Sequence, residues 1–282
     1  EAVPSTFAPM TDAPVPADYV VGPGDQLNVQ LFGSQNRTLR LVVNRDGSVT
    51  FPELGPITVA GLRFEEARSK IEARVAQQMI GVSASVSMGE IRSIRVFVLG
   101  EANQPGNYAV SGLATMTTAL FASGGVKRIG SLRDIQLKRQ GNVVRTLDLY
   151  DLLIRGDTSG DTKLQPGDVI FIPPVGPTVT VEGEVRRPGI YELRGTTNAS
   201  GLLQMAGGLT PESDVRRASL TRVDERSRRV VMETDFGSPE GGSMLLRNGD
   251  SLWVGRLRPQ IDSGVMLEGF VHRPGPVPWR AE

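Results

Sequence analysis

Few of the residue types that carry out catalysis occur in this chain. His272 is the only histidine and there is no cysteine, and the serine and aspartate residues form no recognisable nucleophile motif with it. Glu65 and Glu66 could act as paired acids, but they fall on the polar face of a predicted amphipathic helix near its start, where they favour the helix dipole. The sequence therefore predicts no enzyme, and no catalytic residue, metal site or cofactor.

Basic and tyrosine residues are better suited to binding a ligand. Arg186, Arg187 and Arg273 occur at one place in a repeated sequence. Arginine forks bind carboxylates through two hydrogen bonds, so these residues either decorate solvated hairpins or contact acidic sugars or a neighbouring subunit. Tyr108 and Tyr191 also match across the repeat, and each could stack on a sugar or pack as a half-buried strand residue. Further basic residues gather later in the chain: Arg216, Arg217, Arg226, Arg228 and Arg229.

Composition narrows the class of protein that must position these residues. The chain has 282 residues, 39% of them hydrophobic and 5% aromatic, with 33 glycines and 19 prolines, which is typical of a soluble, strand-rich chain of two or three domains. Its 31 basic and 31 acidic residues cancel, so no net field attracts nucleic acid or an anionic membrane. No stretch approaches the roughly 18 to 20 apolar residues that span a bilayer.

One sequence pattern is written almost three times. "VLGEANQPGNYAV" begins at Val98 and "VEGEVRRPGIYEL" at Val181, and the step from Gly100 to Gly183 is 83 residues. The same step relates Gly124 to Gly207, and "LQPGDVIFIPP" is answered by "LRNGDSLWVG". A third copy, "LEGFVHRPGPVP", begins at Leu267 and stops early. Agreement at separated places predicts tandem modules of one fold, and we expect the chain to be a trimmed piece of something longer.

Each repeat predicts a small mixed sheet with one helix. Strands end at the repeated glycine, and Pro105-Gly106 and Pro188-Gly189 predict type II turns into a second strand, as Pro274-Gly275 does in the third copy. A short apolar segment closed by paired glycines, 115–123 or 197–206, predicts the helix. Three more strands follow in each repeat, the last of them after a turn beside "GD".

The first part of the chain has a different pattern. Residues 1–17 are rich in proline and alanine and predict a flexible tether. Strand candidates flank "GPGD" and Asp46-Gly47, whose aspartates can brace turns by accepting backbone N–H bonds. From Arg63 to Met79 the apolar residues recur on one helical face, which predicts a helix lying on the sheet. These apolar residues are Phe64, Ala67, Ile71, Val75 and Met79.

The string "DYVVGPGDQL", followed by Asp46-Gly47 and "FPELGPITVAGLRFEEARSKI", closely resembles the polysaccharide biosynthesis and export domain of Gram-negative outer-membrane polysaccharide export proteins. The 83-residue units resemble the soluble-ligand-binding β-grasp (SLBB) modules of the same family. The resemblance covers nearly everything from residue 18 onward. It assigns structural turns to Gly22, Pro23, Gly24, Asp25, Asp46, Gly47 and Gly61.

The resemblance implies an α+β chain, in which an N-terminal export domain (18–92) precedes two β-grasp-like modules (93–175 and 176–258) and the truncated start of a third (259–282). It also implies the periplasmic portion of a ring-forming homo-oligomer under the outer membrane, through which a capsular, exopolysaccharide or O-antigen type polymer passes. The ring would meet an inner-membrane polysaccharide co-polymerase. A periplasmic glycan- or ligand-binding module without a conduit is the alternative interpretation.

Overall fold

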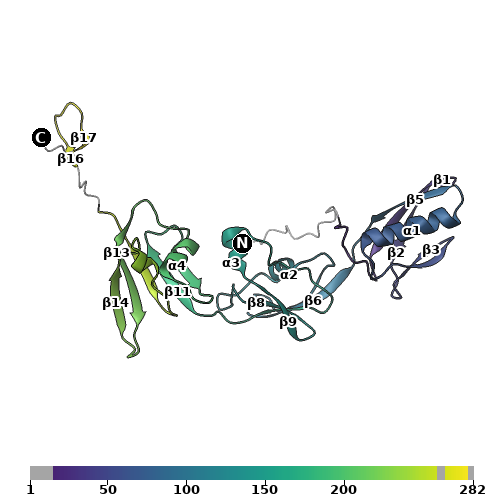
Figure 1. The fold of residues 1–282 in the computed structure, drawn as a ribbon, viewed down its shortest axis with the longest axis horizontal. Coiled ribbons are helices and arrows are strands. Elements are labelled where there is room, and N and C mark those ends of the chain that lie inside the picture. The colour runs from purple at the N-terminus through teal and green to yellow at the C-terminus, as the bar shows by residue number, and fades with distance from the viewer. Residues whose placement is uncertain (1–14, 259–263, 279–282) are drawn as a thin grey trace. The chain divides into compact units, whose positions relative to one another are not determined.

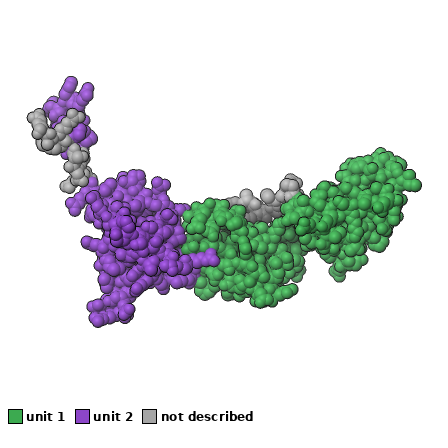
Figure 2. Space-filling view, viewed as in Figure 1, with its two compact units in different colours: residues 1–174 green, residues 175–282 purple. Residues whose placement is uncertain are grey.

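The structure, a computed structural model, describes residues 15–258 and 264–278. The chain divides into two compact units, 1–174 and 175–282 (Figure 2), and each is described by itself. The described residues of the first unit form two separate hydrophobic cores, and those of the second unit form one. Most of the predicted tether, residues 1–14, lies outside the described residues.

The first core lies between a helix and a sheet. Strands β2, β1 and β5 form an antiparallel sheet in that order, while β3 pairs with β4 as a separate hairpin. The elements are β1 (Gln26–Gly33), β2 (Arg37–Val42), β3 (Ser48–Phe51), β4 (Gly55–Thr58), α1 (Phe64–Gln78) and β5 (Val82–Met88). The predicted strand before "GPGD" is wrong: Val20 makes only an isolated bridge to Arg63, because the chain there lies beside the start of α1 instead of in the sheet.

Helix α1 confirms the predicted pattern. All five residues of its expected apolar face are buried, at 8% exposure or less. On the flank of the helix, Arg68 Nε donates to the Val86 carbonyl at 3.2 Å and the Val86 N–H donates to Glu72 at 3.2 Å. Because Val86 belongs to β5, these bonds join the helix to the sheet. Figure 1 shows α1 lying against this sheet.

The second core belongs to module 1, the part of the chain that begins with β6. Its five-stranded sheet has the order β7-β6-β10-β8-β9, in which only β6 and β10 run parallel. The elements are β6 (Ser93–Gly100), β7 (Gly106–Ser111), α2 (Met116–Ala122), β8 (Ile135–Arg139), β9 (Asn142–Leu147), α3 (Leu149–Arg155) and β10 (Val169–Ile172).

Module 2, which begins with β11, repeats this topology in the order β12-β11-β15-β13-β14, with β11 and β15 parallel. The predicted tandem of small mixed sheets is therefore confirmed. The elements are β11 (Thr178–Gly183), β12 (Gly189–Glu192), α4 (Ala199–Met205), β13 (Ser213–Val223), β14 (Arg229–Thr234), α5 (Pro239–Gly242) and β15 (Ser251–Arg256). The prediction of one helix per module is wrong, because Asp148 caps α3 and Ser238 caps the single turn α5.

The repeated glycine ends a strand because the neighbouring strand comes too close for a side chain. Gly100 and Gly183 have φ values of 82° and 84°. A Cβ atom at Gly100 would lie 2.1 Å from the Ile172 carbonyl oxygen, and one at Gly183 would lie 2.0 Å from that of Val254. The same two carbonyls accept hydrogen bonds from the N–H groups of Glu101 and Glu184 at 2.9 Å, so each strand bends where its pairing with the parallel neighbour ends.

The type II turns predicted at Pro105-Gly106 and Pro188-Gly189 are wrong. Gly106 and Gly189 are the first residues of β7 and β12, paired with Val98 and Val181, and neither has a positive φ. The chain reverses direction in the longer loop that starts at the repeated glycine. The reversal is therefore complete before the Pro-Gly pair, whose glycine begins the second strand.

A last hairpin stands where the third repeat was predicted. Strands β16 (Gly264–Leu267) and β17 (Gly275–Pro278) pair antiparallel. Val265 and Leu267 are 39% and 38% exposed, whereas the matching Val179 and Val181 of module 2 are 1% and 0% exposed. Gly269 has a φ of 90°, yet among the described residues nothing lies within 4 Å of its Cβ position. Residues 259–263 and 279–282 of the predicted segment lie outside the described residues.

Candidate functional site

Three buried aspartates hold equivalent turns in the N-terminal part and in the two modules. Asp25, Asp168 and Asp250 are at most 1% exposed. In each turn the aspartate N–H donates to the carbonyl three residues earlier at 3.1 Å, and its carboxylate accepts the N–H of that same residue at 2.8 Å. The glycine before each aspartate has a positive φ between 83° and 95°. The type II turn chemistry is thus found at these Gly-Asp turns.

An arginine neutralises each of these carboxylates. Arg139 donates from Nε and Nη2 to Asp168, both at 2.8 Å, and Arg222 makes the same bidentate pair with Asp250 at 2.9 and 2.6 Å. The hydrogen bonds that they donate to the aspartates raise the pKa of both arginines. Sequence reasoning missed these partners, although Arg139 and Arg222 are spaced by the repeat length.

Asp25 has the densest set of donors. Tyr19 Oη donates to both carboxylate oxygens at 2.8 and 2.9 Å, and Arg92 donates from its backbone N–H at 2.9 Å and from Nη1 at 2.8 Å. Burial and the Asp25 carboxylate raise the pKa of Tyr19 well above its usual range. A Cβ at Gly22 would lie 2.1 Å from Arg92 Nη1, so the first glycine of "GPGD" makes room for this guanidinium.

The other predicted turn residues also brace the backbone. The Asp46 carboxylate accepts the N–H and hydroxyl of Ser48 at 2.9 and 2.8 Å, and these bonds lower the pKa of Asp46. Gly47 and Gly61 have φ values of 84° and 83°. These residues, like those around Asp25, fix loops and leave no side-chain group directed at a ligand.

The residues predicted to contact polysaccharide occupy two kinds of place. Tyr108 Oη and Tyr191 Oη donate to the Gln104 and Arg187 carbonyls at 2.5 and 2.6 Å. Both rings pack against their module's core. Arg187 donates to the Met205 carbonyl at the end of α4 at 3.2 Å. Arg186 and Arg273 are exposed, Arg186 in the loop after β11 and Arg273 in the last hairpin.

Other aromatic residues lie on the sheet face that turns away from the core. Successive strand residues alternate between faces, so buried Ile170 and Ile172 leave Phe171 on the open face of module 1. Lys138 Nζ lies 4.3 Å from the centre of the Phe171 ring. The equivalent residue in module 2 is Trp253, 44% exposed. In the sequence, Phe171 and Trp253 are visible as the aromatic residues of the apolar runs "VIFIPP" and "SLWVG".

Acidic residues accompany Trp253 on the open face of module 2. Trp253 pairs with Glu182 on one side and Ser219 on the other, and Ser219 pairs with Glu233. Both glutamates are exposed. The open face of module 1 therefore has a cation beside its aromatic residue, whereas that of module 2 has carboxylates in the same row.

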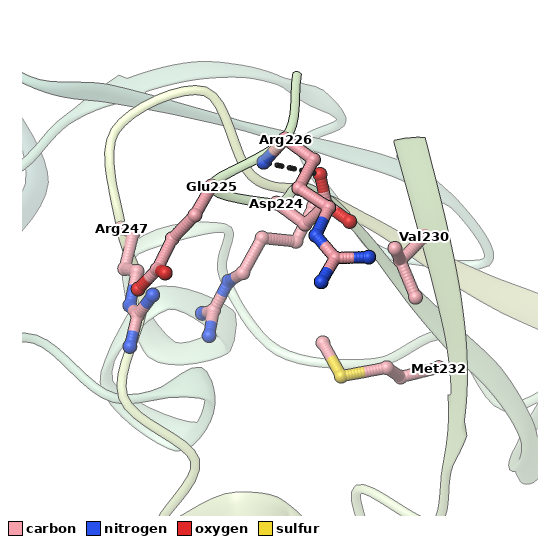
Figure 3. Close-up of a pocket in the computed structure, with 7 residues that line it drawn as sticks. Asp224, Glu225, Arg226, Val230, Met232 and Arg247 are labelled. Atoms are coloured by element: carbon pink, nitrogen blue, oxygen red, sulfur yellow. Dashed lines mark hydrogen bonds between the residues drawn. The ribbon is translucent and has the colours of Figure 1, made fainter. Parts of the chain in front are cut away.

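A shallow hollow lies at one end of module 2, between the β13–β14 loop and the Asp250 turn (Figure 3). It has a cavity volume of about 360 Å³ and is lined by Arg222, Asp224, Glu225, Arg226, Val230, Met232 and Arg247. Arg226 and Arg247 make no side-chain ion pair within the described parts of the chain. This arrangement suits reversible binding of an anion and places no nucleophile beside a base.

Residues 15–258 and 264–278 contain neither a candidate metal site nor a candidate membrane-spanning helix. These residues contain no group of three or more histidine, cysteine, aspartate or glutamate side chains that could hold a metal ion. They also contain no helix with the length and apolar character needed to cross a bilayer.

Comparison with known families divides the chain into the same kinds of part as the sequence patterns. Residues 13–89 match the polysaccharide biosynthesis/export protein family. Residues 94–172 and 178–232 each match an SLBB domain.

Similar proteins are known from several bacteria. The chain is 27% identical over 258 residues to the polysialic acid transport protein KpsD of Escherichia coli, covering 89% of this chain and 44% of KpsD. It is 30% identical over 221 residues to the EPS I polysaccharide export outer membrane protein EpsA of Ralstonia nicotianae, covering 77% of this chain and 58% of EpsA. The capsule polysaccharide export protein BexD of Haemophilus influenzae is 26% identical over 178 residues, covering 62% of this chain and 44% of BexD. The chain thus spans about half the length of these relatives.

Proposed function

Because the chain carries a polysaccharide biosynthesis/export domain followed by two SLBB domains, and is homologous to outer-membrane polysaccharide export proteins, we propose that it is the periplasmic portion of a polysaccharide export conduit. The cargo is a capsular, exopolysaccharide or O-antigen type polymer. The observation that carries this proposal is the order of the three domains together with similarity to KpsD along 89% of the chain.

The proposed mechanism is passive and needs no enzymatic activity. Subunits associate into a ring at the periplasmic side of the outer membrane of a Gram-negative bacterium, and the polymer is driven through the lumen from an inner-membrane polysaccharide co-polymerase. Rigid modules suit this role, because each turn beside a sheet is held by a buried aspartate and its arginine. The proposed domain boundaries are 18–92, 93–175 and 176–258, with 259–282 as the start of a third module.

The open sheet faces are the proposed surfaces for a second copy of the chain. Module 1 presents Phe171 with Lys138, and module 2 presents Trp253 with Glu182 and Glu233. Apolar residues at the centre and opposite charges around them are what two associating faces require. We propose that the module 1 face of one copy packs on the module 2 face of another, while Arg186, Arg187 and Arg273 remain candidates for contact with polymer or with a neighbour.

Deletion and complementation in the source bacterium test the export function. Without the gene, we expect polymer to be synthesised but to accumulate inside the cell, and the full-length gene should restore it to the surface. The measurement is the ratio of surface to intracellular polysaccharide by immunoblot. An unchanged ratio in the deletion strain contradicts the proposal, and so does a complete loss of polymer synthesis.

The hollow in module 2 would also serve a second candidate function, that of a periplasmic glycan-binding module without a conduit. Particle mass in solution separates the two functions. A full-length protein that stays monomeric in detergent and still binds glycan supports the second function, whereas a ring-sized particle supports the first.

A further inference from the structure

The hollow in module 2 lies where the two modules differ. In module 1, strands β8 and β9 are joined by the tight turn Gln140-Gly141, whereas β13 and β14 are joined by the longer loop 224–228. The first residue of the Gly-Asp turn is Gln165 in module 1 and Arg247 in module 2. Module 1 holds its aspartate–arginine pair without these additions, so the fold does not require the extra loop and its charges.

The charges that hold the backbone can be separated from those that face the hollow. Arg222 is bound to Asp250 and to the Leu245 carbonyl, and Arg228 is bound to Asp224. The guanidinium groups of Arg226 and Arg247 and the carboxylate of Glu225 have no ion pair in the described part of the chain. Two cations and one carboxylate are therefore available to a ligand.

The opposite side of the hollow is apolar. Figure 3 shows Val230 and Met232 on β14 facing Glu225 and Arg247 across it. Leu220 pairs with Met232 and is fully buried, so these side chains lie on the core side of the sheet. The neighbouring Arg229 falls on the other face, because strand residues alternate.

We infer that this hollow binds one carboxylate-bearing sugar unit, such as a uronic acid, of the transported polysaccharide; this inference rests on the proposed function. Arg226 and Arg247 bind the carboxylate, since guanidinium groups match carboxylates in geometry and charge. Glu225 accepts hydrogen bonds from sugar hydroxyls, and Met232 and Val230 pack on the C–H face of the ring. A neutral sugar leaves both cations unpaired, and a simple phosphate leaves the apolar side unused. The shallow shape predicts weak, reversible binding that lets a polymer move on.

Titration of the 282-residue chain with trigalacturonic acid, and with maltotriose as the neutral probe, tests this inference. We expect trigalacturonic acid to shift the arginine side-chain NMR signals of Arg226 and Arg247, and maltotriose to leave them unchanged. The double variant Arg226→Gln/Arg247→Gln should weaken binding about tenfold, because charge-assisted hydrogen bonds are lost. Arg229→Gln is the matched control, since it removes the same charge from the opposite face.

Several outcomes would overturn the inference: equal binding of the two probes, no binding of trigalacturonic acid, or unchanged affinity in a double variant whose circular dichroism shows it folded. The export assay is separate. If the wild-type gene restores surface polymer but the chain does not bind trigalacturonic acid, the inference fails and the export function stands. If deletion of the gene leaves surface polymer unchanged, the export function fails whatever the titration gives.

Discussion

The buried carboxylates are the residues on which the turns of this molecule depend most. Each of Asp25, Asp168 and Asp250 is removed from water and surrounded by protein donors, including one arginine. A buried charge is tolerated only when it is paired and hydrogen-bonded. Removing either the aspartate or its arginine therefore leaves a buried or partly buried charge without its partner, which is unfavourable.

Replacing Asp250 with alanine should destabilise module 2. The change removes the carboxylate that accepts from the Arg222 guanidinium and the Arg247 N–H, and leaves Arg222 only the Leu245 carbonyl. We expect a loss of about 2 to 4 kcal/mol in the free energy of unfolding. Trp253, three residues along the chain, reports the transition by fluorescence in urea if Trp279 is first changed to Phe. Asp134→Ala, at an exposed position in module 1, is the control and should leave the Trp253 transition in place.

Tyr19 should make the first part of the chain sensitive to alkali. Its pKa is raised in the folded state, chiefly by burial and then by Asp25, so the folded protein holds the phenolic proton more tightly than the unfolded chain. This contribution is fully present below pH about 10, the pKa of an unfolded tyrosine, and is lost as the pH rises above it. The measurement compares wild type and Tyr19→Phe in urea from pH 8 to 11, and parallel pH curves would contradict the assignment.

Sequence reasoning identified the glycine and aspartate of these turns but not the arginine that pairs with each aspartate. Glycine beside aspartate is a local signal, and the bracing of backbone N–H groups by Asp25 and Asp46 is confirmed. The arginine partners lie 67, 29 and 28 residues away in the chain. No local pattern indicates a pair formed only when separate strands meet. The hollow was missed for the same reason, since its lining comes from the β13–β14 loop, strand β14 and the Asp250 turn.

At the scale of elements, the parallel strand pair explains why the repeat contains a fixed glycine. Gly183 lies against the Val254 carbonyl, at the point where β11 ends and its parallel pairing with β15 stops. Gly249 has almost the same φ, 83° against 84°, but nothing lies within 4 Å of its Cβ position. The two glycines therefore separate the effect of backbone conformation from that of close contact.

Gly183→Ala should destabilise module 2 more than Gly249→Ala. Alanine at either position adopts an unfavourable left-handed conformation, at about 1 to 2 kcal/mol. Only at Gly183 must the parallel strands also separate to admit a Cβ, which should bring the total to about 3 kcal/mol or more. Urea unfolding followed by Trp253 fluorescence measures both variants. Equal losses of unfolding free energy in the two variants would mean that the close approach of the Val254 carbonyl to residue 183 adds nothing to the cost.

The elements that were predicted well are those with a long or repeated pattern. Helix α1 shows its apolar period over four turns, and the strands of the modules are each written twice. Helices α3 and α5 are short, and each begins at a capping side chain, Asp148 or Ser238, which a periodicity test does not detect. The turn prediction from Pro-Gly failed because this dipeptide has two structures in the chain. It leads into a strand that begins at Gly106, but it forms a turn at Pro166-Gly167.

For the whole molecule, the charges beside the two open faces predict how copies associate. Lys138→Glu should weaken association of the full-length protein in detergent by about 1 kcal/mol per contact, because it places like charges together. Combining it with Glu182→Lys should restore association. Sedimentation equilibrium measures both variants, with Lys138→Met as the neutral control. The proposed contact is contradicted if Lys138→Glu leaves association unchanged, or if adding Glu182→Lys does not restore it.

The last hairpin leaves one edge of β16 unpaired among the described residues, with a consequence for handling the protein. In both modules the first hairpin strand is covered on its far side by a parallel strand, but β16 has only β17 among the described residues. Within the described part of the chain, the backbone amide and carbonyl groups on that edge have no partner strand, and beside exposed Val265 and Leu267 they are a template for another polypeptide. Concentrated preparations of these 282 residues should therefore form cross-β aggregates that start at this hairpin, and lysine at Val265 should delay them.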